Sequence, residues 1–155
     1  MYNDSMKMND LRRERGEGAV RIMAVDYGDE RTGIAVSDPT GLIAGETFVI
    51  REWDAERLAD RIAEEAQARG AGLLVLGHPL NMDGTRGPRA EKSEALRDLL
   101  SERTELEIVL WDERRTTVDA ARILHENGRK AKKQKAVIDA VAASLILEGY
   151  LGSLR

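Results

Sequence analysis

Residues 21–38 read RIMAVDYGDERTGIAVSD, and the organisation of the whole chain is best understood from this stretch. Two short apolar runs, 22–25 and 32–36, flank a polar turn that contains Gly28. Apolar runs around a glycine-containing turn are typical of a β-hairpin. Asp26 lies near the end of the first run, where burying an unpaired carboxylate would be very costly. We therefore expect Asp26 to cap the turn, to have a partner or to bind a metal.

The composition indicates a water-soluble globular chain. Its 155 residues are enough for one domain with a single core, and 42% are hydrophobic and 34% charged. Residues 1–18 are polar and lack a sustained period, so we expect a flexible N-terminal tail followed by one domain at 19–155. No apolar run is long enough to span a bilayer, and no signal peptide is evident, which favours a cytoplasmic protein with no membrane partner.

The absence of cysteine limits the metal chemistry that is available. There can be no disulfide framework and no thiolate metal site. Only two histidines, His78 and His125, are present, so oxygen atoms would have to supply most metal ligands. Oxygen ligands favour a hard cation such as Mg²⁺ or Mn²⁺.

The rest of the chain predicts alternating strands and helices. We expect a third strand at 46–50, a helix from an Asp54 N-cap to Gly70, a strand at 72–77, a helix at 89–102, a strand at 106–111, a helix from Thr116 or Thr117 to His125, and a last helix at 134–151. In the helix at 89–102, Ala95, Leu96, Leu99 and Leu100 are expected to face inward. This order predicts an α/β fold, in which an antiparallel meander is followed by parallel crossovers.

Three carboxylates interrupt apolar elements: Asp26 at the end of the first strand, Glu113 at the end of the last, and Asp139 in the final helix. Each has a structural alternative: a turn hydrogen bond for Asp26, a helix cap for Asp112 and Glu113, and an ion pair with Lys135 for Asp139. Their elements are nevertheless expected to converge, and converging carboxylates repel unless protons or cations neutralise them. Two divalent ions roughly 3.5–4 Å apart are the known arrangement for phosphodiester cleavage.

A basic segment precedes Asp139. Residues 129–135 hold five positive charges in seven residues, although the chain as a whole has a net charge of −4. A local basic cluster on an acidic protein favours an anionic partner such as a nucleic-acid backbone, which Arg129, Lys132, Lys133 and Lys135 would contact. The alternative is a solvated helix start.

Four blocks of the chain resemble the signature blocks of the YqgF/RuvX family. They read VDYGDERTGIAVSD, GHPLNMDGTRGPRAE, WDERRTT and KKQKAVIDAVAASLILEGYL, and they occur in order between residues 21 and 151. The family comprises small bacterial proteins described as Holliday junction resolvases and pre-ribosomal RNA nucleases. The resemblance implies an RNase H-like fold: a mixed five-stranded sheet with helices on both faces.

The resemblance also implies a chemistry and a set of site residues. The metal-binding acidic positions of the family fall on Asp26, Glu113 and Asp139, which would be the catalytic residues and hold two Mg²⁺ or Mn²⁺ ions. Asn81 would border the substrate cleft, and Arg114 and Thr117 would contact phosphates, although Thr116 or Thr117 could instead cap a helix. The expected activity is hydrolysis of phosphodiesters in structured RNA or branched DNA, namely processing of the pre-16S rRNA 5′ end or resolution of Holliday junctions, by a monomer or a homodimer.

Two alternative functions remain open at this point. Asp26-Tyr27-Gly28 matches the first phosphate loop of actin-like phosphotransferases and ATPases, but those enzymes bind nucleotide between two such domains. The second alternative is a non-catalytic nucleic-acid-binding protein that assists ribosome assembly. Clustered carboxylates disfavour it, because they would repel a polyanion.

Overall fold

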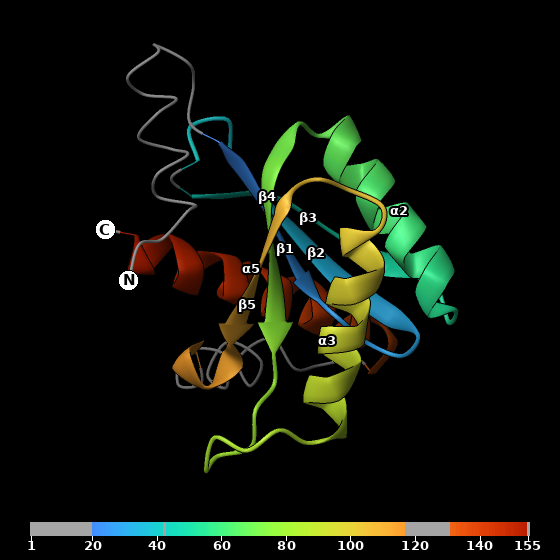
Figure 1. Cartoon of the computed structure of the whole chain (residues 1–155). Coiled ribbons are helices and arrows are strands. Elements are labelled where there is room, and N and C mark those ends of the chain that lie inside the picture. Colours follow the sequence, from blue (N-terminus) through green and yellow to red (C-terminus); the bar gives the residue numbers. More distant parts are fainter. Residues whose placement is uncertain (1–19, 42, 117–130, 155) are drawn as a thin grey trace.

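The computed structural model describes residues 20–41, 43–116 and 131–154, and the side chains of 116 and 131–139 lie outside this description. The strands are β1 (Arg21–Asp26), β2 (Arg31–Ser37), β3 (Ala44–Arg51), β4 (Ala71–His78) and β5 (Glu107–Asp112). The helices are α2 (Ala55–Ala68), α3 (Pro88–Ser101), α5 (Ala131–Ser153) and the short 3₁₀ helix η1 (Glu113–Thr116) (Figure 1).

The strands form one mixed sheet in the order β3-β2-β1-β4-β5. The pairs β1–β2 and β2–β3 are antiparallel, whereas β1–β4 and β4–β5 are parallel. The predicted meander followed by parallel crossovers is therefore confirmed. As a consequence, the carboxyl ends of β1, β4 and β5 meet at one edge of the sheet, which is where ligands gather in α/β proteins.

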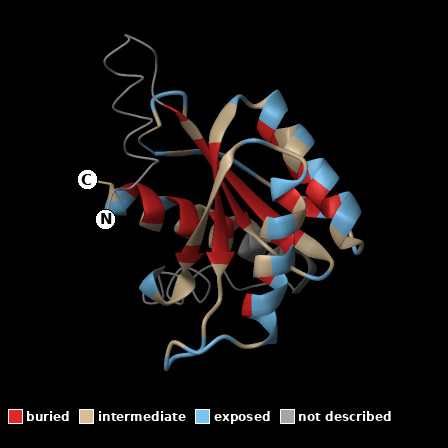
Figure 2. Cartoon of the chain, viewed as in Figure 1, coloured by how far each residue is buried: buried red, intermediate tan, exposed pale blue. Residues whose placement is uncertain are grey.

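Helices cover both faces of the sheet, as predicted: α2 and α3 lie on one face and α5 crosses the other (Figures 1 and 2). Successive residues of a strand point to opposite faces, so β1 contributes to two cores. Met23 and Val25 pack with α2 and α3, while Ile22 and Ala24 pack under α5.

Both ends of α2 agree with the prediction from the sequence, but the buried face of α3 differs from the predicted one. Asp54 accepts a hydrogen bond from the Arg57 backbone N–H at 3.0 Å, and Gly70 ends the helix with a φ of 66°. In α3 the buried residues are Ala90, Ser93, Leu96 and Leu100. The expectation that Ala95 faces inward is wrong: it is exposed, because the helical period places it opposite the line through Ser93, Leu96 and Leu100.

Several expected features lie outside the described residues. They are the N-terminal tail at 1–18, the helix ending at His125, and the side chains of Thr117 and Arg129. Helix α5 begins at Ala131, before the predicted start at residue 134. Within the described part of the chain, no helix has the length and apolar character needed to cross a membrane.

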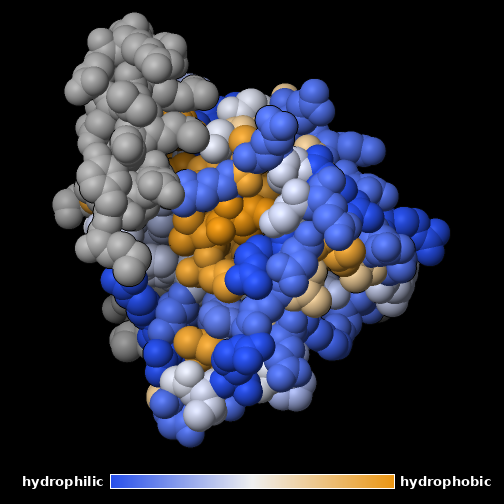
Figure 3. Space-filling model, viewed as in Figure 1, coloured by the Kyte–Doolittle hydropathy of each residue, from blue (hydrophilic) through white to orange (hydrophobic). Residues whose placement is uncertain are grey.

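The hydropathy of the surface changes between the edge strand β5 and the loop that follows β4. Apolar side chains gather over β5, whose residues 107–110 are half-buried, whereas the surface around the loop after β4 is mostly hydrophilic (Figure 3). The carboxyl ends of β4 and β5 thus open onto a polar part of the surface.

Candidate active site

Asp26 and Glu113 come together at the carboxyl edge of the sheet. Asp26 is the last residue of β1, and Glu113 directly follows the last residue of β5. Their carboxyl groups share a hydrogen bond, although β4 separates the two strands. The structure therefore brings together two of the three predicted carboxylates.

Gly77 of β4 makes this meeting possible. A Cβ atom added to Gly77 would lie 3.1 Å from the Glu113 Cδ and 2.7 Å from the Cδ1 of Ile146 in α5. The Glu113 carboxyl group thus lies over bare backbone, where any other residue would crowd it. Glycine within a strand often marks such a close approach. The sequence interpretation missed Gly77, although a glycine ending the apolar run at 72–77 was the available signal.

The surroundings of Glu113 act on its ionisation in opposite directions. Burial raises the pKa of Glu113 above its ordinary value, while the positive charge of Arg89 and the hydrogen bond with Asp26 lower it. Two ionised carboxylates repel each other when they lie side by side away from water. A bound cation would remove this repulsion and stabilise both in the ionised form. Such perturbed groups are characteristic of functional sites.

Asp139 belongs to α5, one helical turn before Ala143, which is buried against the sheet. The Asp139 side chain lies outside the described residues. Among the side chains that are described, no group of three His, Asp or Glu residues is arranged to hold a metal ion. The convergence of the complete predicted trio therefore stays a prediction.

Hydrogen bonds between its own residues hold the conformation of the loop at residues 79–87. The Asn81 Nδ2 donates to the Thr85 Oγ1 at 2.9 Å, and the Thr85 backbone N–H donates to Asp83 at 2.9 Å. Gly84 has a φ of 88°, a conformation that glycine adopts without strain. Asn81 is exposed on this loop, close in sequence to the end of β4.

Arg114 is anchored between Asp112 and this loop. Its Nη2 lies 2.6 Å from the Asp112 Oδ2, and its Nη1 donates to the Met82 carbonyl at 3.4 Å. Asp112 also accepts the Arg114 backbone N–H at 3.0 Å at the start of η1. The helix that Asp112 was expected to cap, beginning after Arg115, lies outside the described residues. The hydrogen bond from Arg114 holds the pKa of Asp112 below its ordinary value.

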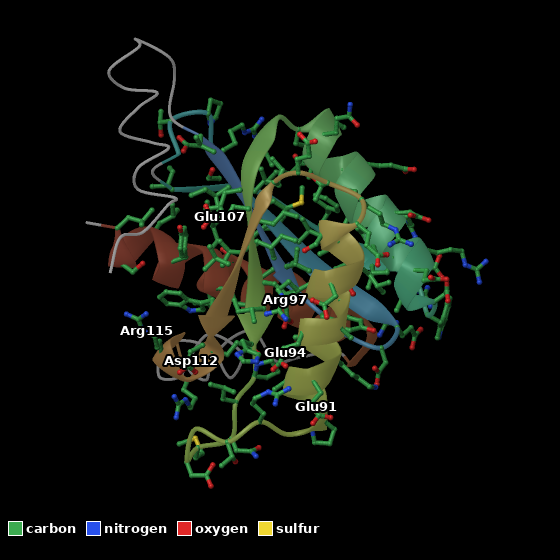
Figure 4. The ribbon with its side chains drawn as sticks, in the orientation of Figure 1. Glu91, Glu94, Arg97, Glu107, Asp112 and Arg115 are labelled. Carbon is green, nitrogen blue, oxygen red and sulfur yellow. The ribbon has the colours of Figure 1, made fainter. Side chains whose placement is uncertain are left out.

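His78 takes part in a separate network with Glu94 and Arg86. The His78 Nε2 lies 2.8 Å from the Glu94 Oε2, to which the Arg86 Nε also donates at 2.7 Å. Hydrogen bonds from Arg86 and then His78 lower the pKa of Glu94 from 4.5 to about 2. Glu94 projects from α3 toward the end of β4, beside the carboxyl edge (Figure 4). The network fixes the end of β4 against α3 and gives His78 a structural role.

Comparison with known proteins reveals close relatives. The sequence model of the RuvX family, described as Holliday junction resolvase, matches residues 20–153. A protein of Acetivibrio thermocellus named "Putative pre-16S rRNA nuclease" is 46% identical over 137 residues, covering 86% of this chain and 96% of that protein. A protein of the same name from Ruminiclostridium cellulolyticum is 42% identical over 133 residues, covering 85% and 94%.

The fold is also found among solved structures. Thermus thermophilus RuvC in complex with a Holliday junction substrate superposes with a TM-score of 0.58 and 11% identity, covering 86% of this chain and 96% of RuvC. At this identity the likeness concerns the fold alone, and it confirms the RNase H-like architecture. The family match spans the sheet and its helices from β1 to α5, and two relatives of nearly the same length exceed 40% identity. The chain belongs to the RuvX family.

Proposed function

We propose that this protein is a metal-dependent nuclease that hydrolyses phosphodiester bonds in structured nucleic acid. The observation that carries this proposal is the hydrogen-bonded pair of Asp26 and Glu113 at the carboxyl edge of the sheet. The names of the relatives and of the family support it, since they describe a pre-16S rRNA nuclease and a Holliday junction resolvase.

The carboxylate pair suits a divalent cation. Two carboxyl groups within hydrogen-bond distance supply the oxygen donors that Mg²⁺ and Mn²⁺ prefer, and burial makes an uncompensated charge on Glu113 unfavourable. Asp26 and Glu113 would hold the metal, with Asp139 as the third ligand, because it precedes the buried Ala143 by one turn of α5. When bound, divalent ions lower the pKa of water to yield hydroxide and neutralise charge on the leaving oxygen.

The protein's own residues would place the substrate beside this pair. Gly77 leaves room for Glu113, which keeps the two carboxyl groups in register across β4. Arg114, held by Asp112, presents a guanidinium group near the ordered loop that carries Asn81. Thr117 and the basic residues Arg129, Lys132, Lys133 and Lys135 would hold backbone phosphates along the entry to α5.

The proposed substrates are the 5′ end of pre-16S rRNA and the four-way DNA junction. Both are polyanions whose shape, rather than base sequence, distinguishes them from ordinary duplex. The chain has only six aromatic residues, which argues against recognition by extensive base stacking. Resolution of a junction needs two cuts, so this activity would require a homodimer, whereas processing of one RNA end would not.

A side-by-side cleavage assay tests the proposal. The purified protein is incubated with Mn²⁺ or Mg²⁺ and three labelled probes: a four-way DNA junction, a linear DNA duplex, and an RNA hairpin with a single-stranded 5′ extension. We expect cleavage of the junction or the RNA, and loss of that cleavage in Asp26→Asn and in the presence of EDTA. Failure to cleave any probe with either metal would overturn the proposal, and ATP hydrolysis without nucleic acid would favour the actin-like alternative.

A further inference from the structure

A cavity of about 320 Å³ lies between the β1–β2 turn and α3. Its walls are residues 27–29 of the turn, Pro79 after β4, and Arg89, Lys92 and Ser93 of α3. This volume is at the lower end of the range for ligand sites, which suits a phosphate group with its sugar.

The cavity adjoins the carboxylate pair. Tyr27, which lines it, directly follows Asp26, and Pro79 directly follows the last residue of β4. A nucleic-acid strand with its scissile phosphate at Asp26 and Glu113 would therefore pass this cavity.

Two cationic side chains of α3 line the cavity. Arg89 is exposed, and within the described part of the chain no hydrogen bond or ion pair of its guanidinium group is found. Lys92 contacts Asp29 at 2.8 Å, and both of these side chains are largely exposed. Exposed ion pairs of this kind contribute little to stability, so Lys92 can exchange Asp29 for a phosphate.

We propose that this cavity binds a backbone phosphate adjoining the scissile one, with Arg89 as its main ligand and Lys92 as its second. The inference rests on the proposed nuclease function and adds a substrate contact to it. A guanidinium group can donate two parallel hydrogen bonds to one phosphate, which fixes the position of the strand as well as its affinity. The site would thereby determine which phosphodiester reaches Asp26 and Glu113.

The first test measures binding without cleavage. Fluorescence anisotropy follows a labelled RNA hairpin with a 5′ extension, or a labelled four-way junction, over a range of salt concentrations with Ca²⁺ in place of Mg²⁺. Arg89→Ala should weaken binding about 10-fold and reduce the slope of log K against log salt by about 1, as expected for one lost phosphate contact. Arg89→Lys should retain the slope, because it keeps the charge.

The matched control is Arg97→Ala on the same helix. Arg97 lies two turns further along α3, contacts Asp98 at 3.3 Å and does not line the cavity (Figure 4). Arg97→Ala removes the same charge as Arg89→Ala but leaves the cavity intact. The affinity for the probe and the salt slope should therefore remain close to those of the wild type. If Arg89→Ala and Arg97→Ala give the same affinity and slope, or if the wild-type protein binds neither probe, the phosphate site is refuted.

A second test locates the phosphate. The probe carries a neutral methylphosphonate in place of one phosphate at successive positions around the cleavage site. At one position next to that site, the methylphosphonate should weaken binding of the probe to the wild type. The same substitution should not further weaken binding to Arg89→Ala. Equal loss in both proteins at every position would overturn the inference. Cleavage by the wild type alongside that result would leave the nuclease proposal standing, whereas Arg89-dependent binding without any cleavage would refute only the nuclease proposal.

Discussion

Glu113 shares a hydrogen bond with Asp26 across the end of β4, above the bare backbone of Gly77. The two carboxyl groups come from strands that are not neighbours in the sheet, since β4 pairs with both β1 and β5. Their contact therefore depends on two parallel registers and on one residue without a side chain.

Gly77→Ala should strongly lower the rate of cleavage and only moderately lower the free energy of unfolding. The new methyl group would lie 3.1 Å from the Glu113 Cδ, so the carboxyl group must move, and small displacements in an active site can cost up to about 100-fold in rate. Crowding of Ile146 should destabilise the fold by about 1–3 kcal/mol. Cleavage kinetics and urea unfolding measure the two effects separately.

The control for this substitution is Gly152→Ala in α5, where an added Cβ would meet no atom within 4 Å. It should leave cleavage unchanged and stabilise the helix by about 0.5–1 kcal/mol. Wild-type kcat in Gly77→Ala would show that the position of Glu113 over Gly77 does not matter for activity.

Asp26→Asn and Glu113→Gln should each reduce cleavage at least about 100-fold, because loss of a metal ligand removes several kcal/mol of transition-state stabilisation. Binding of nucleic acid should be retained or become tighter, since each change removes a negative charge beside the phosphates. Cleavage and anisotropy assays on the same preparations provide the comparison. Weaker binding with unchanged turnover would point to a structural role for the pair.

Glu94→Gln should destabilise the protein at neutral pH. The pKa of Glu94 is lowered from 4.5 to about 2, chiefly by the hydrogen bond from Arg86 and then by that from His78. Because the pKa is lowered in the folded state, ionised Glu94 contributes fully to the free energy of unfolding above pH 4.5. This contribution is lost as the pH falls toward 2. Urea unfolding at several pH values should show the two proteins converging as the pH decreases.

The exposed Glu64 of α2 offers a control for removal of one carboxylate, as Glu64→Gln. A difference between wild type and Glu94→Gln that stays constant from pH 7 to pH 3 would exclude the ionised network as its source.

Replacing Lys132, Lys133 and Lys135 by alanine should weaken binding of nucleic acid and flatten its salt dependence. Each lost phosphate contact should reduce the slope of log K against log salt by about 1. A variant with Arg57, Arg61 and Arg97 replaced by alanine removes the same charge from α2 and α3. If both triple variants show the same slope, the basic segment does not contact phosphates directly.

The local parts of the fold were predictable from the sequence, because hairpins and caps depend on neighbouring residues. The turn at Gly28, the Asp54 cap and the end of α2 at Gly70 are of this kind. Asp26 and Glu113 were also recognisable, since each follows an apolar strand and matches a signature block of the family.

Gly77 and Arg89 were not predicted, because their roles depend on contacts between distant segments. Gly77 matters only once β4 lies between β1 and β5, and Arg89 only once α3 lies beside the first hairpin turn. The exposure of Ala95 shows the same limit within a helix, since the buried face of α3 is set by the sheet beneath it and includes Ser93.

Isothermal titration of Mn²⁺ into the metal-free wild type and Asp26→Asn tests the central claim most directly, namely that the Asp26–Glu113 pair is a metal site. We expect saturable binding of Mn²⁺ to the wild type and at least tenfold weaker binding to Asp26→Asn, with circular dichroism showing that both proteins are folded. Absence of Mn²⁺ binding to the folded wild type, or equal affinity in the two proteins, would contradict it.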